Sequence, residues 1–270
     1  MAYIKTRQEI NLILQGGKKM GKILEDLGKL AKPGISAYEL DLISEKMIIA
    51  SGGVPAFKGY QGRKSDPPFP STTCMSVNEE LVHGVARKNL ILKEGDIFSL
   101  DIGMEYPVNK KNKSGYFTDT AITLIVGDKK PIPEVEKLLR VTKEALEVGI
   151  KAAVPGAPVS AIGKAIEQYV NSQGKYGIVR DLVGHGVGHA VHEDPRVPNY
   201  YDKRLDHFIL KPGMVIAIEP MISLGGYEIV TADDGWTISM ADSSLCAHFE
   251  HTLVITEKGN KVATRRPSEK

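Results

Sequence analysis

Cysteine is scarce in this sequence: Cys74 and Cys246 are the only two among 270 residues. Two cysteines give no disulfide framework, which favours a reducing compartment, so we expect a cytoplasmic protein. No apolar run approaches the roughly 20 residues of a membrane span, and the first residues lack the apolar stretch of a secretory signal. We therefore expect no membrane association. A net charge of +2 is too small to indicate nucleic-acid binding by itself.

Apolar residues, in contrast, make up 42% of the chain, which is enough for a large buried core. The length fits either two compact lobes or one domain. We expect a single catalytic domain over residues 1–270, acting as a monomer.

An internal repeat organises the chain. Residues Ile91–Gly103 read ILKEGDIFSLDIG, and a shift of 118 positions lays them on Ile209–Met221, which read ILKPGMVIAIEPM. The shift aligns Asp101 with Glu219. Each acid follows an apolar segment that is typical of a buried strand.

Helical patterns repeat as well. The apolar spacing predicts helices over Thr6–Leu30, Ala37–Ser51, Leu138–Ala153 and Ser160–Gln173. Ser36 and Glu39 are expected to form a capping box at the second helix. An internal duplication, over roughly residues 6–128 and 136–257, is the simplest explanation and predicts a pseudo-twofold α/β fold. The tail after Ala263 is expected to fray.

Four acids occupy corresponding places in the two halves. Asp101 and Asp119 belong to the first half, and Glu219 and Glu250 to the second. If the symmetry holds, all four face one cavity. Two carboxylates about 4 Å apart repel by roughly 4 kcal/mol at an effective dielectric of 20, so four cannot all ionise without protons or cations between them. Two divalent cations are the simplest neutralisation.

A histidine-rich segment, GHGVGHAVHEDP over Gly184–Pro195, is the expected source of a fifth ligand. Histidines among glycines are poorly suited to core packing, so His185 and His192 are interpreted as functional. His189 fits either a functional role or a solvated, hydrogen-bonded one. Three further histidines are interpreted as structural: His207, His248 and His251.

This ligand set indicates the chemistry. Oxygen ligands with one imidazole suit Mn, Fe(II) or Co, and the absence of a Cys–His cluster argues against structural zinc. Two ions bridged by carboxylates lower the pKa of a shared water and polarise the carbonyl that it attacks. Histidines that do not bind metal can donate to the substrate or the tetrahedral intermediate. The residues therefore predict a metal-dependent hydrolase.

Six ordered motifs resemble the type I methionine aminopeptidases over nearly the whole chain. They are VNEELVHGV around His83, DIG at Asp101, GYFTDT at Asp119, GHGVGHAVHEDP, IEPM at Glu219 and FEHT at Glu250. The resemblance implies the pita-bread α/β fold, a pseudo-twofold repeat of helices packed on a mostly antiparallel curved sheet. It also implies removal of the initiator methionine from nascent chains and N-terminal Met peptides when the next residue is small.

The resemblance further implies a ligand for every position of a two-metal site. Asp101 is implied to bind one ion, His185 and Glu219 the other, and Asp119 and Glu250 to bridge them. Co, Mn, Fe(II) and Zn are the candidate metals, and the sequence does not choose among them.

Catalytic roles follow from the same resemblance. His83 is implied to contact the amino end of the substrate and assist proton transfer. His192 is implied to stabilise the scissile carbonyl as it becomes an oxyanion, and Glu219 to accept a proton from the bridging water. The walls of the methionine pocket are implied to be Tyr60, Phe69, Cys74 and Trp236. Apolar and sulfur-bearing walls suit a thioether, although ordinary packing is the alternative for each residue and explains Tyr60 and Phe69 equally well.

Two loops, Gln61–Pro70 and Tyr106–Ser114, are longer than is usual in that family. The second is expected to form an outward hairpin tip that leaves both aspartates in place. Its lysines allow a transient contact with ribosomal RNA, although a solvated loop is the simpler expectation; they are Lys110, Lys111 and Lys113.

Three rival functions remain open from the residues. A prolidase or aminopeptidase P shares the fold but is expected to carry an additional domain before the metal-binding half. A non-catalytic binding module is expected to have lost metal ligands, whereas all five positions are filled here. A dinuclear phosphoesterase gives no reason for a pocket lined by Trp and Cys.

Overall fold

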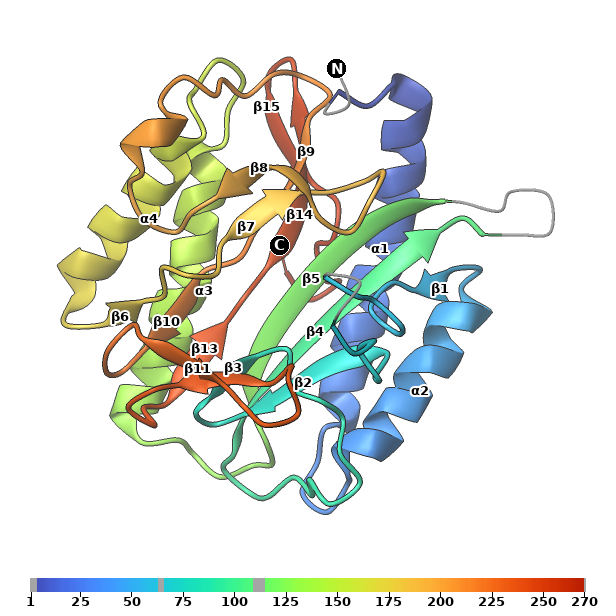
Figure 1. Cartoon of the computed structure of the whole chain (residues 1–270), viewed down its shortest axis with the longest axis vertical. Helices are drawn as coiled ribbons and strands as arrows, with labels where there is room; N and C mark the ends of the chain where they lie inside the picture. The colour runs from blue at the N-terminus through green and yellow to red at the C-terminus, as the bar shows by residue number, and fades with distance from the viewer. Residues whose placement is uncertain (1–3, 63–65, 109–114, 270) are drawn as a thin grey trace.

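Helices flank a central set of strands. The computed structural model describes residues 4–62, 66–108 and 115–269. Figure 1 shows α1 and α2 on one side of the molecule, α3 and α4 on the other, and strands between them. The helices are α1 (Arg7–Leu30), α2 (Ala37–Ala50), α3 (Pro133–Ala152), α4 (Ser160–Gln173) and the short 3-10 helix η1 (Lys203–Leu205). All four predicted helices are present, and α3 begins earlier than expected because Pro133 is compatible with a first helical turn.

The strands form four sheets, and every described pairing is antiparallel. The first half contributes β1 (Val54–Pro55), β2 (Thr73–Val77), β3 (Glu80–Val82), β4 (Ile97–Tyr106) and β5 (Tyr116–Ile125). The second half contributes β6 (Gly177–Ile178), β7 (Gly184–Gly186), β8 (Glu193–Val197), β9 (Val215–Ile218), β10 (Met221–Ser223), β11 (Ile229–Thr231), β12 (Ile238–Met240), β13 (Cys246–His248), β14 (His251–Thr256) and β15 (Gly259–Val262). In the larger sheets, β4 pairs with β1, β2 and β5, and the order β15-β14-β9-β7-β8 forms the other.

Capping boxes fix the start of the first two helices. The Thr6 hydroxyl accepts from the Glu9 backbone N–H while the Glu9 carboxylate accepts from the Thr6 N–H. Ser36 and Glu39 make the same exchange at α2, as predicted. Each box satisfies two of the free N–H groups at a helix start, which sets where the helix begins.

The repeat seen in the sequence has a counterpart in the hydrogen bonds. After α1 the Gly34 N–H donates to the Leu92 carbonyl at 2.8 Å, and after α3 the Gly156 N–H donates to the Leu210 carbonyl at 2.9 Å. The two turns that precede the acid-bearing strands also match. Gly95 N–H donates to the Val126 carbonyl at 2.8 Å, and Gly213 N–H to the Ile255 carbonyl at 2.9 Å.

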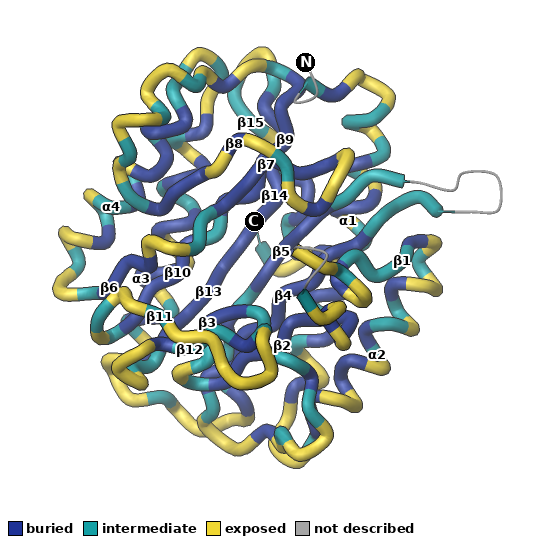
Figure 2. The backbone as a smooth tube through the Cα atoms, in the orientation of Figure 1, coloured by how far each residue is buried: buried dark blue, intermediate teal, exposed yellow. Residues whose placement is uncertain are grey.

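Each half has its own apolar core under its own pair of helices. In the first half α1 and α2 cover β2 and β4, with Met20, Leu24, Leu100 and Ile102 fully buried between them. In the second half α3 and α4 cover β9 and β14 through a similar set. Figure 2 shows the central strands mostly buried, whereas the exposed residues lie in loops, on outer helix faces and on the peripheral strands β8 and β11. The side chains that these central strands carry are therefore held in place by core packing on both sides of the molecule.

The C-terminal tail departs from the prediction. The sequence predicts fraying after Ala263, but Thr264 is fully buried and Arg266 is only 5% exposed. The tail is held because its backbone packs on α1 and its arginines form ion pairs. The expectation failed because these partners are distant in sequence.

The two long loops are described in part. Gln61–Pro70 contains no helix or strand in its described residues, as predicted. The loop between the aspartates is shorter than expected at its start, because β4 continues to Tyr106, which pairs with Tyr116 of β5. Lys110, Lys111 and Lys113 lie outside the described residues. Within the described ranges, no helix is both long and apolar enough to cross a bilayer.

Candidate active site

Strand periodicity brings the four acids to one face. On β4, Leu100 and Ile102 pack toward the helices, so Asp101 between them points to the opposite face. On β9, Ile216 and Ile218 pack toward the helices. Glu219 follows directly and falls on the same helix-free side as Asp101. Asp119 on β5 and Glu250 before β14 alternate in the same way with helix-facing neighbours.

His185 reaches these acids from β7, where glycines flank it on both sides. A Cβ on Gly184 would lie 2.4 Å from the Ala217 carbonyl, and one on Gly186 would lie 2.2 Å from the Asp194 carbonyl. Only glycine therefore lets β7 pass so closely between its neighbouring strands. The His185 Nδ1 lies 2.9 Å from the Gly186 carbonyl. A carbonyl can only accept, so Nδ1 carries the proton and Nε2 presents its lone pair to the acids.

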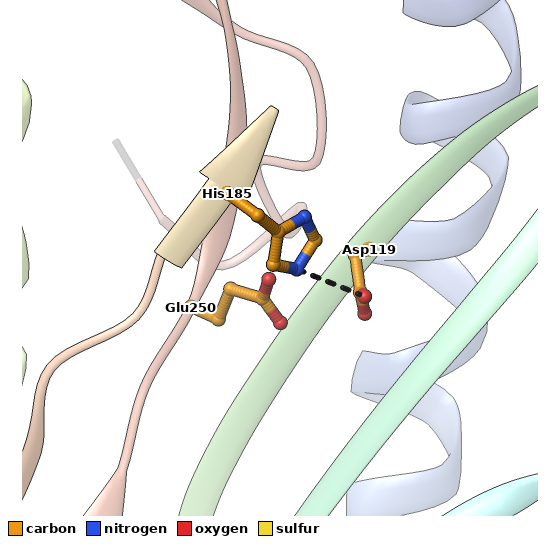
Figure 3. Close-up of side chains that lie close together, drawn as sticks. All are labelled: Asp119, His185 and Glu250. Carbon is orange, nitrogen blue, oxygen red and sulfur yellow. Dashed lines mark ion pairs between the residues drawn. The ribbon is translucent and has the colours of Figure 1, made fainter. Parts of the chain in front are cut away.

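Three side chains converge most tightly. Ligand atoms of Asp119, His185 and Glu250 all lie within 4.8 Å of one another (Figure 3). His185 Nε2 is 4.0 Å from Asp119 Oδ2 and 3.7 Å from Glu219 Oε1. The spacing leaves room for a cation between the atoms rather than direct hydrogen bonds.

The electrostatics of this cluster call for a cation. Burial raises the pKa of Asp119 to about 7, and burial together with Asp119 raises the pKa of Asp101 and Glu250 well above the usual range. One buried carboxylate oxygen of each lacks a hydrogen-bond partner: Asp101 Oδ1, Asp119 Oδ1 and Glu250 Oε1. Buried oxygens without donors are costly unless a positive group meets them. Carboxylates with one imidazole are a suitable donor set for divalent metal ions.

All of the predicted site residues line one pocket of about 310 Å³. They are Tyr60, Phe69, Cys74, His83, Asp101, Asp119, His185, His192, Glu219, Trp236 and Glu250. The structure adds residues that sequence reasoning missed: Phe57, Val82, Asp181, Leu182, Val183, Gly184, Arg196 and Met221. Val82, Gly184 and Met221 lie inside the quoted motifs without an assigned role, whereas the other five lie outside every motif, so only the fold reveals that they line the pocket.

His83 and His192 border the acids. The His83 backbone has a φ of 57°, a left-handed conformation that is uncommon for histidine. Burial lowers the pKa of both imidazoles to about 4, so both are neutral near pH 7. The rings of His185 and His192 meet edge to face, with centroids 4.4 Å apart. His185 and His192 therefore face the same part of the pocket.

The opposite wall of the pocket is apolar. Phe69 and Trp236 pack edge to face with centroids 5.3 Å apart, and Cys74 is 5% exposed. The Trp236 indole N–H donates to the Pro67 carbonyl at 3.1 Å, which ties the wall to the long loop. Burial raises the pKa of the Cys74 thiol, so it remains a neutral, sulfur-bearing surface.

His248 and His189 lie near the site in different ways. His248, interpreted from sequence as structural, is 2% exposed and places Nε2 3.5 Å from Glu219 Oε2. Burial acts to raise the pKa of Glu219, but His248 and His185 outweigh it and lower the pKa below its usual value. His189 instead faces outward and pairs with Glu9 at 2.8 Å.

Threonine hydroxyls join the two halves behind the acids. Thr252 Oγ1 accepts from the Asp119 N–H at 2.9 Å and donates to the Asp119 carbonyl at 2.8 Å. Thr120 Oγ1 donates to the Glu250 carbonyl at 2.8 Å. We call this junction of β5 with residues 248–252 the seam. It fixes the spacing of Asp119 and Glu250.

Comparison with known proteins agrees with this geometry. The family model described as "Metallopeptidase family M24" matches residues 11–257 of this chain. Methionine aminopeptidase 1 of Bacillus subtilis is 43% identical over 265 residues, covering 98% of this chain and 100% of that protein. The methionine aminopeptidase structure from Thermotoga maritima superposes with a TM-score of 0.87 at 40% identity, covering 97% of this chain and 99% of that one. A prolidase from Pyrococcus furiosus gives 0.74 at 25% identity, and the match covers 97% of this chain but only 65% of the prolidase.

These matches confirm the predicted pita-bread α/β fold. They span nearly the full length of the chain and of its methionine aminopeptidase relatives. The chain belongs to metallopeptidase family M24.

Proposed function

We propose that this chain is a methionine aminopeptidase, a metal-dependent hydrolase that removes the initiator methionine from N-terminal Met peptides and nascent chains when the second residue is small. The proposal depends above all on the composition of the pocket. Carboxylates and an imidazole of the kind that bind metal ions face an apolar wall there. Full-length relatives with that name support it.

The metal site is proposed to hold two divalent ions. Asp101 would bind one, His185 and Glu219 the other, and Asp119 and Glu250 would bridge them. When bound, such a pair activates a shared water and polarises the scissile carbonyl. The carboxylate oxygens that lack partners support the assignment.

The protein's own side chains then handle the proton and the substrate. Glu219, whose pKa is kept low by His248 and His185, is charged near pH 7 and is proposed to accept the proton of the attacking water. His83 is proposed to hold the substrate's amino end. His192 is proposed to donate a hydrogen bond to the developing oxyanion, which requires a proton on the ring nitrogen that faces the substrate.

The methionine side chain is proposed to enter the apolar side of the pocket, against Tyr60, Phe69, Cys74 and Trp236. Aromatic rings and a neutral thiol favour a flexible thioether over a charged side chain. Phe57, which sequence reasoning missed, packs with this set.

The remaining assignments are also proposals. Few cysteines support a reducing, cytoplasmic location. We propose one catalytic domain over residues 1–270, with the two repeats described above, and a monomer. We also propose a transient ribosome contact through Lys110, Lys111 and Lys113, which would bring the protein to nascent chains.

The decisive experiment strips the protein with chelator and then assays release of methionine from Met-Ala-Ser. Mn, Fe(II), Co and Zn are added back separately to find which ion supports turnover. The proposal expects no activity after stripping and recovery with at least one metal. An Xaa-Pro peptide and a phosphate ester are run in parallel. Preferential turnover of either would support a prolidase or a phosphoesterase and overturn the proposal, and metal binding without any turnover would indicate a non-catalytic binding module.

A further inference from the structure

The C-terminal segment Ala263–Glu269, which we call the strap, lies between helix α1 and strand β5. Its backbone passes so close to α1 that only glycine fits beneath it. A Cβ on Gly17 would lie 2.7 Å from the Ala263 carbonyl, and one on Gly21 would lie 2.6 Å from the Thr264 carbonyl. The glycines of α1 therefore leave room for the backbone of the strap to pass directly over the helix.

The strap reaches the seam at several points. The Ala263 N–H donates to the Thr252 carbonyl at 2.8 Å and the Thr264 hydroxyl accepts from the Thr252 N–H at 3.1 Å, whereas Arg266 is the strap residue that contacts β5. Its side chain is 5% exposed. One nitrogen, Nη1, donates to the Ala121 carbonyl at 3.3 Å, and the other, Nη2, donates to Glu269 Oε1 at 2.5 Å. The ion pair with Glu269 balances the buried charge and orients the guanidinium.

The atoms that Arg266 touches are connected to both bridging acids. The Ala121 carbonyl also accepts from the Glu250 N–H at 3.0 Å. The Thr120 hydroxyl, which lies 3.5 Å from Arg266 Nη1, donates to the Glu250 carbonyl at 2.8 Å. Thr120 and Ala121 directly follow Asp119 in β5. One guanidinium thus holds the point where the backbones of the two acids meet.

Arg266 lies on the helix-facing side of this junction. His251, which packs 3.4 Å from Arg266 Nη2, is fully buried there, whereas Asp119 and Glu250 project into the pocket. Arg266 does not line the pocket, so any effect on the reaction passes through the backbone.

We propose that Arg266 is a positioning residue of the metal site, which fixes the separation of Asp119 and Glu250 by clamping the seam from behind. The inference rests on the proposed metal site, and only its catalytic consequence rests also on the proposed peptidase activity. Residues that support metal ligands from outside the coordination sphere typically affect affinity or activity by about 10- to 100-fold.

The test compares Arg266→Met with a matched control, Arg265→Met. Arg265 also belongs to the strap and also forms an ion pair, with Glu147 on α3, but it does not contact the seam. Calorimetry measures the Kd for Mn on stripped protein, at a temperature where both variants are folded by circular dichroism. We expect the Kd to rise roughly tenfold or more in Arg266→Met and by less than threefold in Arg265→Met. In the Met-Ala-Ser assay at saturating metal, kcat should fall while KM changes little.

If Arg266→Met does not fold, Arg266→Lys tests the positioning role of Arg266 instead. Its ammonium keeps the ion pair with Glu269, but it lacks the second arm that reaches the Ala121 carbonyl. We expect the thermal midpoint to stay close to that of the wild type while the Mn affinity still falls at least threefold.

The outcomes separate the two proposals. If a folded Arg266 variant binds Mn as tightly as Arg265→Met, Arg266 is only a structural residue and the inference is overturned, whatever the peptidase activity of the wild type. If the wild type binds Mn but does not cleave Met-Ala-Ser, the proposed function fails, and the calorimetric comparison still tests Arg266.

Discussion

Tyr60 and His192 form a hydrogen bond across the pocket, with the phenol oxygen 2.8 Å from Nδ1 of the imidazole. The two residues are 132 positions apart in sequence, and their rings meet edge to face at 5.2 Å. If the phenol donates to Nδ1, the neutral ring carries its proton on Nε2. That tautomer can donate a hydrogen bond to the substrate, as the proposed role requires.

Tyr60→Phe removes this contact and keeps the ring. Because the loss of one hydrogen bond is worth about 1 kcal/mol, we expect kcat on Met-Ala-Ser to fall roughly fivefold. The apolar wall is unchanged, so KM should stay within about twofold of the wild type. Steady-state kinetics measure both. A rise in KM with kcat unchanged would show that Tyr60 shapes the pocket without orienting His192.

Lys5 and Glu193 form an ion pair at 2.5 Å that is buried at Lys5 and largely buried at Glu193, with side chains 1% and 12% exposed. The other Glu193 oxygen accepts from the Ala190 N–H at 2.9 Å, so the pair holds the segment between His185 and His192. Lys5→Met leaves an unpaired buried carboxylate and should lower the free energy of unfolding by about 3–5 kcal/mol. Urea denaturation measures the loss.

Two companion variants check this reason. Adding Glu193→Gln to Lys5→Met removes the unpaired charge and should restore most of the stability. Lys29→Met breaks a surface pair with Glu25, in which Lys29 is 63% exposed, and should leave the free energy of unfolding nearly unchanged, because water and salt screen an exposed pair. Equal losses for Lys5→Met and Lys29→Met would contradict the importance of burial.

Thr252→Val tests the seam. The hydroxyl is buried and serves both the N–H and the carbonyl of Asp119, so valine leaves two buried backbone groups without partners. We expect a loss of about 2–4 kcal/mol in the free energy of unfolding. Thr142→Val is the matched control, because its buried hydroxyl donates only to the Leu138 carbonyl within α3. Similar small losses for both variants would mean that the Thr252 hydroxyl does not hold the seam.

The metal-stripped protein should lose stability as the pH rises. Asp119 has its pKa raised from 3.8 to about 7 in the folded state, so between these values the folded state holds a proton that the unfolded state has released. Folding is therefore favoured at the acidic end of this window, and the advantage disappears as the pH rises through about 7. Thermal midpoints of stripped protein should fall from about pH 5 to pH 8.

Saturating metal should abolish this fall, because the ions bind the deprotonated carboxylates and their affinity rises with pH. A thermal midpoint of the stripped protein that rises steadily over the same range would contradict the raised pKa that burial gives Asp119.

The acid positions were predictable because two separate signals agreed. The repeat aligned Asp101 with Glu219, and strand periodicity then fixed which face each side chain occupies. His185 was predictable from its flanking glycines, which the structure explains by the close passage of β7. The helices were predictable from local spacing and from capping residues that lie within a few positions of each other.

What escaped prediction depends on contacts between distant segments. The ordered tail needs the glycines of α1, and its Arg266 needs the backbone of β5. Phe57 and His248 join the site only because β1 and β13 are brought to it by the fold. No local pattern in the sequence encodes such pairings.

Anomalous diffraction from crystals of the manganese-loaded protein tests the central claim most directly. We predict two manganese peaks in the pocket, both in contact with Asp119 and Glu250, one also with Asp101 and the other with His185 and Glu219. Saturated crystals with no peak among these five side chains, or with manganese bound only elsewhere, would contradict it.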